Sequence, residues 1–401
     1  MPEARPYIGG QAVLEGVMMR SPHSLAVAVR RRSGRVEVRE RPVRQTRTGP
    51  ASWPLLRGML SLVEALKLGT EALRWSSERY EADHDDEATS DAASPPASPP
   101  ASPPGVLTLA LLVVAMLVAS GPDDAAAAAA SPPGGEPPPA PRPPDPGPRA
   151  APDESAARRV LSVLTIVLPL GLFIVLPQAL AAATSRFAHL DLDVRSVPFQ
   201  AMTGVFKLAV VVGYLLLIRR VPEIRRVFQF HGAEHKTIST YEALEPLDLA
   251  HARGKTTLHP RCGTTFLVMV ALVSIIVFSA IGPLLPHLGV GKLAENAMFL
   301  ALKLPFLPVI AAFTFELQRF SARYCTTGPL RALLWPGFVV QRITTIEPDD
   351  AQLEIALASL RVTLWREADP KAAPSTTTDA TFDDYAALAA SAGFEGRAAF
   401  G

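Results

Sequence analysis

Two histidines and a glutamate, His231, Glu234 and His235, lie within five residues of one another. On a helix, residues four apart project from the same face, so both imidazoles would point the same way with the carboxylate beside them. Zinc-assisted hydrolysis needs such a set, because the metal acidifies water and the carboxylate accepts its proton. The pattern H-x-x-E-H is also the inverted zincin signature, which uses a further acidic ligand downstream. We expect Glu316 to fill that role, with Glu234 as the catalytic base.

A second pair of candidate ligands follows at His259 and Cys262, whose H-x-x-C spacing is half of a zinc site. Two alternatives stay open here. The segment could be a helix N-terminus that binds an anion with help from Arg261, or a structural cap. If His231, His235, His259 and Cys262 all bind one ion, the site is closed and structural.

The first cluster also has a purely structural interpretation, as a polar, hydrogen-bonded cap on a helix bundle. Gly232 lies inside the motif and lowers its helix propensity, which favours that interpretation.

Four hydrophobic segments, 160–184, 202–218, 265–285 and 297–315, are long enough to span a membrane. A fifth, 106–120, is short, and we expect that it does not cross as a single span. Pro305 and Pro308 break the last segment. The hydrophobic fraction of 48% agrees with a membrane protein that has polar ends.

Loop charge predicts the orientation of these spans. The connection between Arg219 and Arg261 is rich in arginine and lysine, and is therefore expected in the cytoplasm. The N-terminal part carries a run of arginines and no apolar signal-peptide core in its first 30 residues. We expect these arginines to contact the phosphate groups of lipids, and we do not expect the chain to bind nucleic acid. The motifs would then face the cytoplasm at the inner membrane.

Lys207 and Lys303 lie inside predicted spans. Charged groups at that depth are costly and indicate function, here an anionic headgroup held beside broken helices. The alternative is that both side chains extend to the headgroups at the membrane surface.

The N-terminal part should fold outside the membrane. Alternating apolar residues on either side of Ser33-Gly34 predict a β-hairpin over 24–43, and glycines around the stretch 9–20 suggest backbone bends. Residues 54–75 read as an amphipathic helix, which either lies at the membrane interface or covers the β region. Proline- and alanine-rich stretches should remain disordered.

The predicted architecture is mainly α, a polytopic membrane helix bundle of about four spans with a small N-terminal β-containing region. Its regions are a cytoplasmic hairpin region (1–50), an interfacial helix (51–80), a disordered insert (81–159), two spans (160–218), the cytoplasmic motif loop (219–264), two spans (265–315), a cytoplasmic helical region (316–368) and a disordered tail (369–401).

Four sequence blocks, in this order, resemble a bacterial family of integral membrane proteins, the YqhQ-like family: Gly9–Arg20, His231–Ile238, His259–Phe266 and Thr344–Asp350. The resemblance covers about residues 7–80 and 160–365, and the long insert departs from it. The resemblance implies a membrane location. It also implies a metal-dependent activity, because the family is described as predicted metal-dependent enzymes. Carried onto this chain, the functional positions are His231, Glu234, His235, His259 and Cys262.

The leading hypothesis is therefore a membrane metalloenzyme, of hydrolase type, with a divalent ion such as zinc on the cytoplasmic face. The alternative is a non-enzymatic transporter, scaffold or lipid- and anion-binding protein in which the histidine and cysteine clusters are structural.

Overall fold

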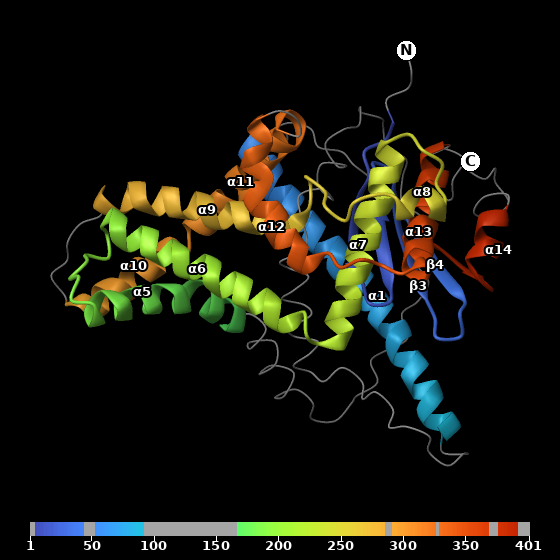
Figure 1. Cartoon of the computed structure of the whole chain (residues 1–401), viewed down its shortest axis with the longest axis horizontal. Helices are drawn as coiled ribbons and strands as arrows, with labels where there is room; N and C mark the ends of the chain where they lie inside the picture. Colours follow the sequence, from blue (N-terminus) through green and yellow to red (C-terminus); the bar gives the residue numbers. More distant parts are fainter. Residues whose placement is uncertain are drawn as a thin grey trace, which may run out of the picture.

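The computed structural model of the chain describes residues 5–43, 53–91, 167–284, 291–325, 329–368 and 376–391. The fold is mostly helical and contains one antiparallel sheet. Figure 1 shows the sheet with α7 and α13 at one end of the molecule, and α5, α6, α9 and α10 extending from the other. The short hydrophobic segment 106–120 lies outside the described residues, as does the insert from 92 onward.

The sheet is a simple meander of five strands in the order β1-β2-β3-β4-β5, each antiparallel to its neighbour. The strands are β1 (Gly9–Val13), β2 (Gly16–Arg20), β3 (Ser24–Arg30), β4 (Val36–Pro42) and β5 (Thr378–Phe382). The hairpin predicted over 24–43 is confirmed as β3 and β4. Its turn contains Gly34 at φ +88°, a conformation that glycine adopts without steric cost.

Two parts of the sheet go beyond what the sequence predicts. Residues 9–20, whose glycines predict bends around a buried segment, form a second hairpin of the buried strands β1 and β2. Residues 376–391 of the tail are folded, which corrects the prediction of disorder there: β5 pairs with β4, and α14 (Tyr385–Ala390) follows. Asp379 of β5 accepts from Arg39 of β4 at 2.7 Å, so a cross-strand ion pair accompanies the ladder.

One face of the sheet is covered by the long helix α1 (Pro54–Asp91). Gly69 of this helix packs against the side chain of Gln11 in β1, and Arg20 of β2 donates to Glu64 at 2.7 Å. The helix therefore covers the β region, which is one of the two roles that the sequence predicts for it. It continues to Asp91, so residues 81–91 are helical and the predicted disordered insert does not begin at residue 81.

The opposite face is covered by α7 (Pro222–Glu242) and α13 (Asp350–Ala368), which pack against each other. Gly10, the strand neighbour of Gln11, faces Glu234 of α7, as expected because adjacent strand residues point to opposite faces. Covering both faces buries nearly all of β1, β2 and β3.

A buried ion pair joins this second face to α13. Arg366 donates two hydrogen bonds to the Glu40 carboxylate of β4, one of them at 2.5 Å, and Ser24 donates a third at 2.8 Å. The Glu40 and Arg366 side chains are 0% and 3% exposed, so neither charge has water as an alternative partner. Each therefore depends on the other.

Within the described residues, three helical stretches are long and apolar enough to cross a membrane: Val167–Phe187, Val197–Ile218 and Gly263–Leu284. They comprise the π-helix η3 (Gly171–Val175) with α5 (Leu176–Phe187), then α6 (Val197–Ile218), and finally α9 (Gly263–Ile281) with the short η4 (Gly282–Leu284).

A bent pair of helices, α10 (Lys292–Lys303) and α11 (Phe306–Tyr324), makes a fourth stretch if it counts as one span. It bends by 49° beside Pro305, at a break that the sequence predicts. The remaining helices are α8 (Leu249–Arg253), η5 (Pro329–Leu334) and α12 (Trp335–Thr344).

The pair Glu40–Arg366 provides a test of this packing. Glu40→Ala should lower the free energy of unfolding by about 3–5 kcal/mol, because it leaves the Arg366 guanidinium buried without its counter-charge. Denaturant unfolding of the full chain in a non-ionic detergent measures the change. Arg74→Ala, which breaks an exposed ion pair with Glu78 on α1, is the control and should cost about 0.3–0.5 kcal/mol. Equal stability of the two variants would show that the Glu40–Arg366 pair does not stabilise the packing of α13 on the sheet.

Candidate metal centre

Three of the residues expected to bind metal come together in the structure. The side chains of His231, His235 and Cys262 each offer one ligand atom, and these three atoms lie within 4.8 Å of one another. The two histidines are one turn apart on α7, and Cys262 is the residue immediately before α9. All three are buried. The arrangement could hold a metal ion.

The orientation of both imidazoles is fixed by backbone carbonyl groups. His231 Nδ1 lies 3.0 Å from the Thr344 carbonyl oxygen, and His235 Nδ1 lies 2.5 Å from that of Thr257. A carbonyl oxygen can only accept, so each Nδ1 carries the proton and donates it. Each neutral imidazole then has its lone pair on Nε2. Metal-binding histidines usually have this arrangement, with the second nitrogen donating to a carbonyl or carboxylate.

The thiol of Cys262 faces the first of these imidazoles. Its Sγ lies 3.2 Å from His231 Nε2 and 3.1 Å from Thr264 Oγ1. Burial raises the pKa of the Cys262 thiol, but a charge on His235 and hydrogen bonds with His235 and Thr264 lower it by more. With neutral imidazoles, whose Nε2 atoms accept, the thiol keeps its proton; a metal ion that replaced this proton would bind the thiolate.

Burial has the opposite effect on the histidines. Loss of water lowers the pKa of His231 to about 4, although the hydrogen bond to Thr344 partly opposes the shift. Loss of water likewise lowers the pKa of His235, against the attraction of Cys262. Both imidazoles are therefore neutral at neutral pH, as metal coordination requires.

Two glutamines attach the loop before α9 to the neighbouring helices. Gln341 of α12 accepts from the His259 amide at 2.9 Å and donates to the His259 carbonyl at 2.7 Å and to Thr265 Oγ1 at 2.8 Å. Gln318 of α11 donates to the Cys262 carbonyl at 3.0 Å. Both glutamines are buried, so these bonds hold the cysteine in place without competition from water.

Gly232 has a positive structural role that the sequence did not show. A Cβ atom at this position would lie 2.1 Å from the carbonyl oxygen of Ile346, so only glycine lets the segment 344–348 cross α7 so closely. That segment supplies the Thr344 carbonyl to His231, and Lys236 of α7 forms an ion pair with Glu347. Gly232 thus permits the contact that orients His231.

His259 lies next to the cluster but is not one of its three members. Its ring centroid is 5.6 Å from that of His235, and its side chain is buried. His259 Nε2 lies 3.3 Å from Glu242 Oε2, while Nδ1 accepts from the Arg261 amide at 3.4 Å. Glu242 also forms an ion pair with Arg261. In this structure His259 therefore belongs to a neighbouring polar network.

The structure does not bring Glu316 to the cluster. Its two carboxylate oxygens accept from Arg57 Nη2 of α1 at 2.8 and 2.7 Å. The reason is helical geometry: Gln318, two residues later on α11, faces Cys262, and two residues correspond to a rotation of about 200°. The third residue of the cluster is Cys262, not the downstream glutamate expected from the sequence.

Glu234 is buried on the sheet side of α7. Its carboxylate carbon would lie 2.9 Å from a Cβ atom at Gly10 of β1, which explains why that strand carries a glycine. The carboxylate is one residue from His235 in sequence, but it is not a member of the three-residue cluster.

The residues that sequence reasoning missed are those that support the cluster: Thr257, Thr264, Gln318, Gln341 and Thr344. The first and last act through backbone carbonyls, which carry no residue-type signal. Thr344 does fall in a segment singled out by its resemblance to the family, and that is the one signal that pointed to it.

A family model described as "Protein of unknown function (DUF1385)" matches residues 53–365, which include all three cluster residues. The chain belongs to this family. A relative in Bacillus subtilis (strain 168), described as "Uncharacterized protein YqhQ", is 27% identical over 367 residues, which cover 90% of this chain and 94% of that protein. The resemblance to the YqhQ-like family inferred from sequence is thus confirmed. No solved structure matches the chain.

The close approach at Gly232 predicts how the cluster responds to a methyl group. Gly232→Ala should displace segment 344–348 and cost about 1–3 kcal/mol of stability through overpacking. In a Cys325→Ser background, the displaced segment should also expose Cys262, so that a maleimide labels it faster than in the parent protein. Gly213→Ala is the control, because a Cβ atom on that helical glycine meets nothing within 4 Å. Slow labelling of both variants would show that segment 344–348 does not depend on Gly232.

Proposed function

We propose that this chain is an integral membrane metalloenzyme that binds zinc through His231, His235 and Cys262 and catalyses a hydrolysis. The observation that carries the proposal is the pair of Nδ1–carbonyl hydrogen bonds, which leave two Nε2 lone pairs beside the buried Cys262 thiol. Imidazole and thiolate are the ligands that zinc prefers. The residues therefore fit this ion.

The number of ligands favours catalysis over a purely structural role. Structural zinc sites have four protein ligands, whereas catalytic sites have three and leave one position for water or substrate. Zinc in such a site supplies Lewis acidity and lowers the pKa of water to about 7. In this proposal Glu234, buried one residue from His235, would serve as the proton acceptor.

The proposed location is the cytoplasmic face of the inner membrane. Val167–Phe187, Val197–Ile218, Gly263–Leu284 and the bent pair α10–α11 would cross the bilayer as four spans. The basic residues between Arg219 and Arg261 favour the cytoplasm for the loop that carries the cluster. The lipid bilayer is then the chain's first partner.

Metal content tests the ligand set. The purified full chain should contain about one zinc per molecule, and His235→Ala and Cys262→Ser should each lose it, because two remaining ligands bind zinc weakly. Glu316→Gln is the matched control and should keep its zinc, since Glu316 is paired with Arg57. Elemental analysis by mass spectrometry gives the ratios. Zinc retained by the folded His235→Ala and Cys262→Ser proteins would refute the site.

Hydrolysis is tested by separating metal binding from catalysis. Wild type should hydrolyse at least one of a panel of chromogenic carboxylic esters, phosphate esters and peptides. Glu234→Gln should retain zinc and lose about 10²–10⁴-fold in rate, because the proton acceptor is gone. If Glu234→Gln keeps the wild-type rate, the assigned base is wrong.

The second candidate is a structural zinc site in a non-enzymatic membrane protein. One observation favours it: the buried His259 ring lies 5.6 Å from that of His235 and could supply a fourth ligand. His259→Ala separates the candidates. It should keep zinc if the site has three ligands, and should lose affinity if His259 closes the site.

A further inference from the structure

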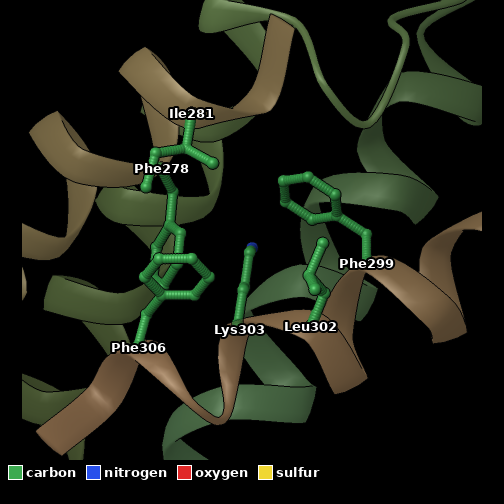
Figure 2. Close-up of a pocket in the computed structure, with 6 residues that line it drawn as sticks. All are labelled: Phe278, Ile281, Phe299, Leu302, Lys303 and Phe306. Carbon is green, nitrogen blue, oxygen red and sulfur yellow. The ribbon is translucent and has the colours of Figure 1, made fainter. Parts of the chain in front are cut away.

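A buried ammonium group lies at the bend between α10 and α11. Lys303 is 6% exposed, and its Nζ lies 5.1 Å from the ring centroid of Phe278 and 4.8 Å from that of Phe299. Figure 2 shows the side chain rising between these aromatic rings into a small pocket. Apart from Lys303, the lining is apolar and consists of Phe278, Ile281, Phe299, Leu302 and Phe306.

The hydrogen-bond partner of this ammonium is a neutral amide. Lys303 Nζ donates to Gln178 Oε1 of α5 at 2.8 Å, and Gln178 donates in turn to the Asn296 carbonyl of α10 at 2.8 Å. Within the described part of the chain, no carboxylate forms an ion pair with Lys303. The carbonyl groups at the C-terminus of α10 offset only part of its charge.

A second lysine increases the imbalance. Lys207 of α6 donates to Ser274 Oγ of α9 at 3.1 Å, one turn before Phe278, whose ring Lys303 faces. The described residues place no carboxylate against Lys207 either. Within the described part of the chain, α5, α6, α9 and α10 thus bring two lysines and no carboxylate partner to one region of the apolar bundle.

We propose that this pocket binds the anionic group of an amphiphile, a lipid phosphate or a fatty-acid carboxylate, with Lys303 as the main contact and Lys207 as a second positive charge. An anion would stabilise the ammonium form of Lys303, since an unpaired charge among apolar helices is costly. The aromatic and aliphatic side chains around it would contact the acyl chain that continues from such an anionic group. The site is distinct from the metal cluster, because Phe278 is sixteen residues along α9 from Cys262, or about 24 Å.

Lipid binding to the full chain in a non-ionic detergent tests the proposal, with native mass spectrometry as the readout. Phosphatidylglycerol should bind wild type at least about tenfold more tightly than phosphatidylcholine with the same acyl chains, a difference of about 1.4 kcal/mol. Lys303→Met should remove this preference. Lys303→Arg, which keeps the charge, should retain most of it.

Lys292→Met is the matched control, because Lys292 lies on the same helix but is 82% exposed and paired with Asp191. It should leave the preference unchanged. Oleate and inorganic phosphate are added as competitors. Displacement by oleate identifies a site for carboxylates as well as phosphates, whereas resistance to oleate identifies a phosphate headgroup.

Three results would overturn the proposal: equal binding of the two lipids to wild type, an unchanged preference in Lys303→Met, or displacement of the lipid by inorganic phosphate alone. If Lys303→Met fails to fold, the comparison of the two lipids on wild type and on Lys303→Arg still decides the question.

Discussion

The candidate centre depends on one constraint, the burial of two imidazoles and a thiol away from water. A buried N–H must find an acceptor, and both Nδ1 atoms find a backbone carbonyl, that of Thr344 or that of Thr257. This choice leaves both Nε2 atoms as acceptors, and Cys262 lies beside His231 Nε2. The hydrogen bonds that satisfy the buried groups therefore also prepare them as ligands.

The same constraint explains how the two ends of the molecule are joined. Helix α7 is held between β1, where Gly10 accommodates Glu234, and the segment 344–348, which crosses it at Gly232. Cys262 comes from the start of the apolar helix α9 and is held through its carbonyl by Gln318 of α11. The cluster thus forms where the sheet end of the molecule in Figure 1 meets the long apolar helices. The distances between its ligand atoms therefore depend on how the sheet end packs against the long apolar helices.

Much of this could be predicted from sequence where the signal is local. The hairpin over 24–43, the apolar stretches and the break at Pro305 follow from periodicity and proline positions. All three residues of the cluster, His231, His235 and Cys262, follow from short motifs. Pairings between distant residues could not. β5 pairs with β4, which lies more than 300 residues earlier in the chain. The Glu316 side chain faces Arg57 and not the cluster, because of its position around the axis of α11. A carbonyl contact such as that of Thr344 depends on backbone position, which residue type does not reveal.

X-ray absorption at the zinc edge on the purified full chain tests the ligand set most directly. A site formed by His231, His235 and Cys262 predicts a first shell of one sulfur at about 2.3 Å, two imidazole nitrogens at about 2.0–2.1 Å and one further light atom that does not come from the protein. A shell without sulfur, or with three imidazoles in which His259→Ala removes one, would contradict an open site formed by His231, His235 and Cys262.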